Sequence, residues 1–190
     1  MRVGYPLLAM LPLLIVFSCG GGSGGDGPVP EPADPSSNLI ASFEPKEPNP
    51  VALDINADQD AASGNLVTMM IQVTEVDDVF AGGFDLLYDP AYAEFVGHGP
   101  GSLLESGGDK PVYLVDPFPA GTLTVGVSRS SGGAGGADAN GTVPLIRLTF
   151  RAKQAGTSKF QLRNHHLANA QSPPAPITGL TWHGGTLVAN

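Results

Sequence analysis

AGGFDLLYDP, at residues 81–90, is the stretch that decides the fold class. Apolar side chains recur at every second position from Phe84 to Tyr88, with aspartate or leucine between them. This period of two predicts a β-strand that packs one face on a core. Pro90 lacks a backbone N–H and restricts Asp89 before it, so we expect the strand to end there.

The same period of two continues on both sides of this stretch, and no segment after residue 41 has a convincing helical period. It predicts strands at residues 51–55, 66–74, 84–89, 93–97, 112–115, 122–128, 146–151, 159–163 and 186–189. One apolar and one polar face per strand indicates antiparallel sheets on a single core. The predicted fold class is therefore all-β, a nine-stranded jelly-roll β-sandwich. An immunoglobulin-type sandwich is the alternative, although its Cys–Trp–Cys core pattern is missing.

The alternation also predicts which side chains lie between the sheets. The expected core members are Ile71, Leu86, Val125 and Leu148. Asp77 and Asp78 are expected in a turn, because aspartate favours turns. Gly141 after Asn140 is expected to form a tight hairpin turn, since glycine accepts a positive φ.

Composition limits the partners that the chain can bind. The 190 residues suffice for one domain with extensions. Lysine and arginine number 9 against 18 acidic residues, which gives a net charge of −9. No basic patch can then replace the counterions of a nucleic acid, nor attract an anionic lipid surface. We therefore expect no nucleic-acid partner, and membrane attachment only through a lipid anchor.

Residues 1–18 have the layout of a secretory signal peptide. Arg2 precedes an apolar run at residues 7–17, which is shorter than the roughly 20 residues of a membrane-spanning helix. The run ends in VFSC at residues 16–19, which resembles the bacterial lipobox, whose cysteine is acylated and becomes the first residue. Cys19 is the only cysteine, so no disulfide within the chain competes for it. We expect an exported lipoprotein, anchored through Cys19 at the outer membrane or the cell surface. An ordinary signal peptide with an incidental cysteine is the alternative.

A flexible tether is predicted next. Residues 19–40 hold the lipidated cysteine and a stretch rich in glycine and proline, GGGSGGDGPVPEPADPSSN. Little apolar area is available there to offset chain entropy, so we expect disorder with a polyproline-like outer half. The tether would hold the β-sandwich domain, residues 41–190, away from the membrane.

Three stretches together resemble the cohesin domain family. AGGFDLLYDP is similar to the family's glycine-led strand that ends in Tyr-Asp-Pro. Residues 93–104 are similar to the strand that follows it and its Pro-Gly-Ser-Leu-Leu turn. GTVPLIRLTFRAK, at residues 141–153, resembles the family's Gly-Thr-Leu-x-x-Ile-x-Phe-x-Ala-Lys. Order and spacing hold from about residue 50 onward, so the resemblance covers the whole module.

The resemblance implies a flattened jelly roll, related to carbohydrate-binding modules, that binds dockerin on one face. Dockerin is a small calcium-loaded helical module of partner proteins. The face belongs to the sheet with the Tyr-Asp-Pro strand, and its expected partner-binding residues are Asp85, Leu87, Thr122, Thr124 and Ser128. Leu87 is the expected apolar anchor, with a lone surface leucine as the alternative. Ala81 and Gly83 stand where the best-known cohesins carry dockerin-binding Asn and Asp, so that contact chemistry does not carry over.

Nothing in the sequence predicts an enzyme. It holds no Ser-His-Asp order, nucleophile elbow, phosphate-binding loop or zinc motif. Asp85 and Asp89 would lie about 13 Å apart along a strand, too far for a pair of glycosidase carboxylates.

We expect no cofactor, with calcium as a weaker hypothesis. The calcium candidates are Asp54, Asn56, Asp58 and Asp60, which place oxygens at every second position as calcium loops do. Gln59 stands where such a loop needs glycine, so a solvated acidic turn between the first two strands is favoured. His165 and His166 would point to opposite faces of a strand and cannot share a metal easily.

Two functions compete. The favoured one is a surface-anchored module that captures a dockerin-type protein, linked to polysaccharide degradation. The alternative is direct polysaccharide binding, which needs coplanar exposed aromatic rings. The exposed candidates are Tyr92, Tyr113, Phe118 and Trp182. A purely structural envelope protein is a third hypothesis.

The anchor is tested by replacing the lipobox cysteine. Wild-type protein should partition into the detergent phase of Triton X-114, because several acyl chains hold a protein stably in a membrane. Cys19→Ser should leave the protein unprocessed or in the aqueous phase. Equal partitioning of the two forms would contradict lipidation at Cys19.

Overall fold

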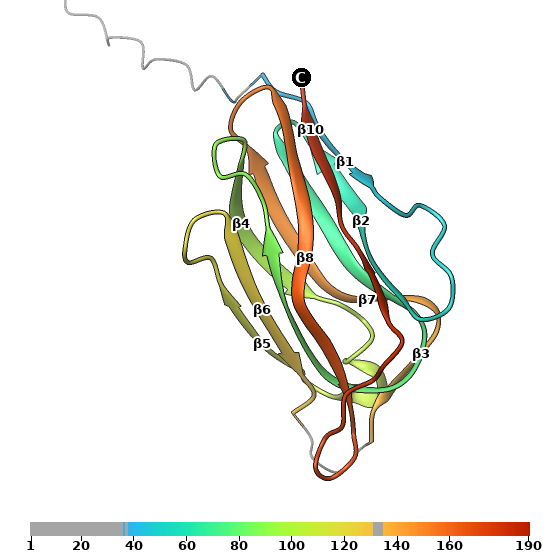
Figure 1. Ribbon diagram of the computed structural model, residues 1–190. Coiled ribbons are helices and arrows are strands. Elements are labelled where there is room, and N and C mark those ends of the chain that lie inside the picture. Colours follow the sequence, from blue (N-terminus) through green and yellow to red (C-terminus); the bar gives the residue numbers. More distant parts are fainter. Residues whose placement is uncertain (1–35, 37, 131–134) are drawn as a thin grey trace, which may run out of the picture. The chain divides into compact units, whose positions relative to one another are not determined.

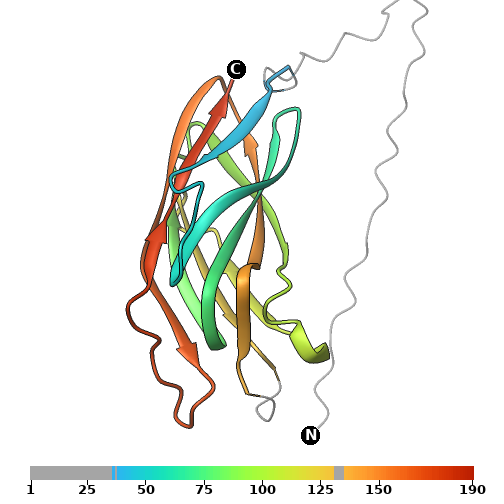
Figure 2. The ribbon, with the colours of Figure 1, turned by 90° about the vertical axis from the view of Figure 1, so that its right-hand side faces the viewer.

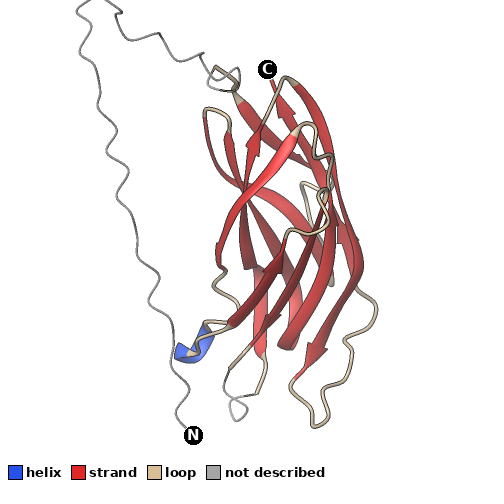
Figure 3. Ribbon diagram, turned by 90° about the vertical axis from the view of Figure 1, so that its left-hand side faces the viewer, coloured by secondary structure: helices blue, strands red, loops and turns tan. Residues whose placement is uncertain are grey.

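The computed structural model describes residues 36, 38–130 and 135–190. Most of these residues form strands, and the one helix among them is the short 3₁₀ helix η1 (Ser106–Gly108), so the all-β prediction is confirmed (Figure 3). In this part of the chain, no helix is long and apolar enough to cross a bilayer. The signal peptide, Cys19 and nearly all of the tether lie outside the described residues and stay predictions.

Ten strands make up the β-sandwich (Figure 1). They are β1 (Ala41–Pro45), β2 (Asp54–Ser63), β3 (Leu66–Leu87), β4 (Ala93–Pro100), β5 (Val112–Asp116), β6 (Thr122–Ser128), β7 (Ala137–Ala152), β8 (Gly156–Asn169), β9 (Thr181–His183) and β10 (Gly185–Ala189). The strand predicted at residues 122–128 has the bounds of β6, and most other predicted strands fall inside longer ones. Strands β1 and β9 were not predicted from the sequence.

Strand β3 belongs to two layers. Its N-terminal half pairs with β2 and β7, and its C-terminal half pairs with β6 and β8. One layer therefore has the order β9-β2-β3-β7-β4, and the other has the order β1-β10-β8-β3-β6-β5. All pairs are antiparallel except β2 with β9. The last strand, β10, pairs with β1, so the first and last strands of the sandwich are neighbours (Figure 2).

The turn predicted at Asp77 and Asp78 is wrong, because β3 bends there instead of reversing. Glu75 and Asp78 have φ of 50° and 57°, and the ladder with β7 shifts register on both sides of Val76. Extra residues of this kind bend and twist a strand without ending it. The Asp78 carboxylate accepts the Gly136 N–H at 2.9 Å, which fastens the bend to the start of β7.

The hairpin turn predicted at Asn140 and Gly141 is also wrong. Both residues lie inside β7, where Gly141 has a φ of 77°. The Gly141 N–H donates to the Glu75 carboxylate at 2.7 Å. The positive φ that the sequence indicated therefore serves a bulge opposite the bend of β3.

Residues 54–60 form neither the calcium loop of the weaker hypothesis nor the acidic turn that was favoured, so both predictions are wrong. Asp54, Asn56, Asp58 and Asp60 lie along strand β2, where alternate residues are about 6.6 Å apart and cannot converge on one ion. Asp54 accepts the Val51 N–H at 2.9 Å. Asp60 pairs with Arg147 at 2.9 Å. Over residues 36, 38–130 and 135–190, no group of three His, Cys, Asp or Glu side chains could hold a metal.

The core lies between the two layers and confirms the predicted register. Ile71, Leu86 and Leu148 are 0% exposed and Val125 is 2% exposed. Tyr88, the tyrosine of the Tyr-Asp-Pro motif, packs on the aromatic rings of both layers. Its ring centroid lies 5.2 Å from that of Phe150 on β7 and 5.8 Å from that of Phe160 on β8. The motif thus joins the layers at the end of β3.

Adjacent leucines on β3 test this register. Leu86→Ala should lower the free energy of unfolding by about 2 to 5 kcal/mol, because it empties space in a closed core. Leu87→Ala should cost markedly less, since Leu87 is only half-buried on the outer side of the sheet. Urea unfolding measures both values. A larger loss for Leu87→Ala would mean that the strand is shifted by one residue.

Candidate functional site

Four adjacent strands present one continuous outer surface. We call it the candidate face: the outward side chains of β8, of β3 over residues 79–87, of β6 and of β5. The ladders place Asp85 between Thr124 of β6 and Arg163 of β8, and Leu114 of β5 beside Gly126 of β6. The predicted partner-binding residues lie on the two central strands of this face.

A hollow of about 280 Å³ lies at the centre of the candidate face. Gly83 and Gly126 line it without side chains, and His166 and Leu114 stand on opposite sides. A Cβ on Gly83 would lie 3.0 Å from Cε1 of His166, so glycine makes room for the imidazole ring. Leu114 is 67% exposed and therefore offers an apolar contact at the edge of the hollow.

The rim of the hollow is a hydrogen-bonded group around Asp85. Its carboxylate accepts from Thr124 Oγ1 at 2.8 Å and from Asn164 Nδ2 at 2.7 Å. Both hydrogen bonds hold the pKa of Asp85 below its usual range, and the bond from Asn164 has the larger effect. Asn164 has a φ of 48° and occupies a break in the β3–β8 register, which places it beside Asp85. The rim is therefore anionic at neutral pH and held on two sides.

The structure brings together only some of the predicted partner-binding residues. Asp85 and Thr124 are bonded to each other, and Leu87 lies opposite Thr122 on β6. Ser128 lies at the far end of the face, where its hydroxyl donates to the Arg129 carbonyl at 2.9 Å. Leu87 is half-buried and so offers less apolar surface than expected of an anchor.

Three residues of the hollow were missed by sequence reasoning. They are Leu114, Asn164 and His166. The segment VYLV at residues 112–115 is apolar throughout, so its period does not show which side chains point outward. The run NHH at residues 164–166 is a polar signal inside a strand, and it could have indicated the site.

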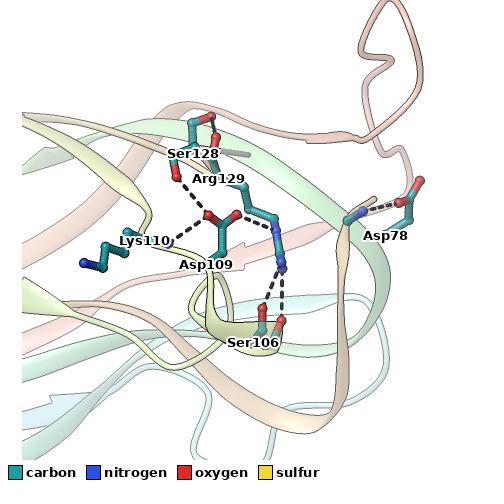
Figure 4. Close-up of polar contacts among 8 residues, drawn as sticks. Asp78, Ser106, Asp109, Lys110, Ser128 and Arg129 are labelled. Carbon is teal, nitrogen blue, oxygen red and sulfur yellow. Dashed lines mark hydrogen bonds and ion pairs between the residues drawn. The ribbon is translucent and has the colours of Figure 1, made fainter. Parts of the chain in front are cut away.

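A buried ion pair fixes the chain that leads into the edge strand β5 (Figure 4). Arg129, just after β6, donates through Nε to Asp109 Oδ2 at 3.1 Å. Its other nitrogens donate to Ser106 Oγ at 3.0 Å and to the Ser106 carbonyl at 2.8 Å. Both charged side chains are 4% exposed. The segment from η1 to β5 is thereby attached to the end of β6, which positions Leu114 on the face.

The aromatic candidates for a sugar platform do not contact one another among the described residues. Tyr113 lies against His98, and Trp182 stacks on His165 with ring centroids 4.5 Å apart. Tyr92 packs beside Gly156, whereas Phe118 is 80% exposed in the loop after β5. Among the described residues, no two of these four rings are in contact. The four rings therefore do not adjoin to form one sugar platform.

Comparisons with known proteins agree with the fold and with the resemblance to the cohesin family. A model of the cohesin domain matches residues 51–185. The sixth cohesin of scaffoldin B from Acetivibrio cellulolyticus, solved in complex with a mutant Cel5 dockerin, is similar with a TM-score of 0.57. It is 14% identical over 72% of this chain and 97% of that chain.

Two further solved structures share the fold. A type II cohesin domain from the cellulosome of Acetivibrio cellulolyticus has a TM-score of 0.55 and 17% identity, over 72% of this chain and 94% of that chain. The seventh type I cohesin of ScaB from Pseudobacteroides cellulosolvens has a TM-score of 0.52 and 15% identity, over 65% of this chain and 81% of that chain. No curated protein matches the sequence.

The buried pair predicts a large difference between two arginine substitutions. Arg129→Ala should lower the free energy of unfolding by about 3 to 5 kcal/mol, because it leaves the Asp109 carboxylate buried without its cation. Arg151→Ala should cost about 0 to 1 kcal/mol, since Arg151 and its partner Glu94 are 41% and 55% exposed. Urea unfolding of both variants measures the contrast. Equal losses would show that the Arg129 pair is not a structural anchor.

Proposed function

The chain belongs to the cohesin domain family, and we propose on that basis that its β-sandwich is a non-catalytic module that captures a dockerin-type protein. The family match covers most of the described sandwich. One of the similar solved structures is a cohesin bound to a dockerin, which supports this class of partner. The candidate face is the proposed binding surface.

The observation that carries this proposal is the chemistry of the hollow. An exposed leucine stands beside a glycine floor, and a hydrogen-bonded polar rim lies around it. Protein interfaces are commonly organised in this way, with an apolar anchor that a polar ring shields from water. Leu114 is therefore the proposed anchor, and Asp85 with Thr124 belongs to the ring.

The polar contacts would come from a different strand than in the best-known cohesins. Ala81 and Gly83 of β3 offer no side-chain hydrogen bonds, whereas Asn164 and His166 of β8 reach the same hollow. The Asn164 amide already donates to Asp85, and its carbonyl oxygen can accept from a partner. We propose that β8 supplies the polar contacts that Ala81 and Gly83 of β3 cannot make.

Anchoring extends the proposal to the cell surface. Lipidation at Cys19 and the tether of residues 19–40 would hold the module outside the membrane while leaving the candidate face accessible. A partner that degrades polysaccharide would then be held at the cell surface through its contact with this module.

The anchor role of Leu114 is tested with purified, calcium-loaded dockerin modules encoded by the same genome. Leu114→Asp should weaken the binding of a cognate dockerin by about 2 kcal/mol or more, because it places a charge in a desolvated contact. Thermal unfolding should change little, since Leu114 is already exposed. Isothermal titration calorimetry measures the affinity.

Val96→Asp is the matched control for this test. Val96 is 45% exposed on β4, in the other layer, and the substitution adds the same charge. It should leave dockerin affinity unchanged. Equal losses for both variants, or no binding of any encoded dockerin by the wild-type chain, would contradict the proposal.

A further inference from the structure

A second concave site lies on the other side of β8 from the Leu114 hollow. This groove has a volume of about 810 Å³, within the range typical of ligand sites. The side chains of interest along it are Glu44, Lys46, Lys159, Gln161, Arg163 and Trp182. We call it the β8–β10 groove. It shares Asn164 with the hollow around Leu114, and its Lys159, Gln161 and Arg163 are outward side chains of β8.

The groove exists because the segment that runs beside β8 leaves its sheet partway along that strand. Strand β10 pairs with β8 only from Gly156 to Phe160, whereas β8 continues to Asn169. Before Gly184 the chain belongs to β9, which pairs with β2 in the other layer. A Cβ on Gly184 would collide with the Phe160 carbonyl, so only glycine allows this close crossing. The C-terminal part of β8, beyond Phe160, therefore has no β10 neighbour and lies beside an open space.

The charge of the groove is opposite to that of the chain. The net charge is −9, yet three of the nine lysine and arginine residues line this one site. Among the described residues that line it, Glu44 is the one carboxylate. Lys46, Lys159 and Arg163 form no ion pair with any described carboxylate, unlike Arg129, Arg147 and Arg151. These three cations are therefore available to an anionic ligand.

The groove also has a rigid aromatic wall. The His165 ring stacks on Trp182 with centroids 4.5 Å apart and planes at 12°. Trp182 is supported from the core side by Phe84, at 6.0 Å. The Gln161 amide and the Thr186 hydroxyl also line the groove. The Gln161 oxygen accepts from Arg163 Nη2 at 3.1 Å, which leaves the Gln161 NH₂ group as a donor, and the Thr186 hydroxyl can donate and accept. The exposed His165 ring, backed by Trp182, lies beside these hydrogen-bonding groups and suits a sugar ring with hydroxyl groups.

We propose that the β8–β10 groove binds an acidic oligosaccharide of the uronic acid class. Its carboxylates pair with Lys46, Lys159 and Arg163, because charge-assisted hydrogen bonds of this kind are strong and directional. Its hydroxyls bond the neutral side chains, and a sugar face lies against the His165–Trp182 stack. The inference does not rest on the Leu114 anchor, since the hollow around Leu114 contributes none of these groups.

The test uses the one tryptophan of the chain as a local reporter. Trp182 is the single tryptophan and lines the groove, so its fluorescence reports binding there. Full-length protein is titrated with oligogalacturonate and with a neutral cello-oligosaccharide of the same length. The acidic sugar should change the fluorescence in a saturable way, and calorimetry should give the same affinity. The neutral sugar should bind at least about tenfold more weakly.

Two double variants separate the groove from general charge effects. Lys46→Gln with Lys159→Gln should weaken oligogalacturonate binding by about tenfold or more. Lys110→Gln with Lys153→Gln removes the same charge outside the groove and should leave the affinity unchanged. Thermal unfolding of both variants verifies that each is folded.

Several results would overturn the proposal. One is equal loss in the two double variants, and another is equal binding of the neutral sugar. Tighter binding of a polyglutamate peptide than of oligogalacturonate would assign the groove to acidic peptides instead. Absence of both a fluorescence change and a calorimetric heat with oligogalacturonate would also overturn it. None of these outcomes bears on dockerin capture, which Leu114→Asp tests separately.

Discussion

Strand β3 has to serve two sheets that face each other across one core, and this requirement shapes the rest of the module. Its 22 residues pair with β2 and β7 in one layer and with β6 and β8 in the other. A flat strand could not do this, so β3 bends at Glu75 and Asp78, where φ is positive. The bulge at Gly141 lies opposite this bend, and its hydrogen bond to Glu75 lets β7 remain paired with β3 on both sides.

The composition of the candidate face follows from the way β8 joins β3. The register of their ladder shifts between Gly83 and Asp85, and Asn164 occupies the shift with a positive φ. Asn164 consequently bonds Asp85, while His166 occupies the space above Gly83. Gly83 has no hydrogen-bonding side chain of its own, and it thereby makes room for the His166 side chain of β8. The same bulge separates His166, on the face, from His165, which stacks on Trp182.

Two regions of unlike chemistry therefore lie on the two sides of β8. On the β3 side, an exposed leucine and an anionic rim suit a protein surface. On the β10 side, unpaired cations and stacked rings suit an anionic ligand with flat faces. A module with both proposed sites could hold a partner protein and an acidic oligosaccharide together. The buried Arg129–Asp109 pair serves only the first region, because it sets the position of β5.

The sequence by itself determined the fold class, the bounds of β6, the family and the buried face of each central strand. Burial of one face imposes a period of two on a strand, so Leu86 and Val125 could be assigned to the core without a structure. Only the tertiary structure decided that β3 is continuous, that the acidic stretch at residues 54–60 is a strand, and that Leu114, Asn164 and His166 share one hollow. Asp85 and Asn164 are 79 positions apart in the chain. Their contact depends on the pairing and register of separate strands, which local periodicity does not encode.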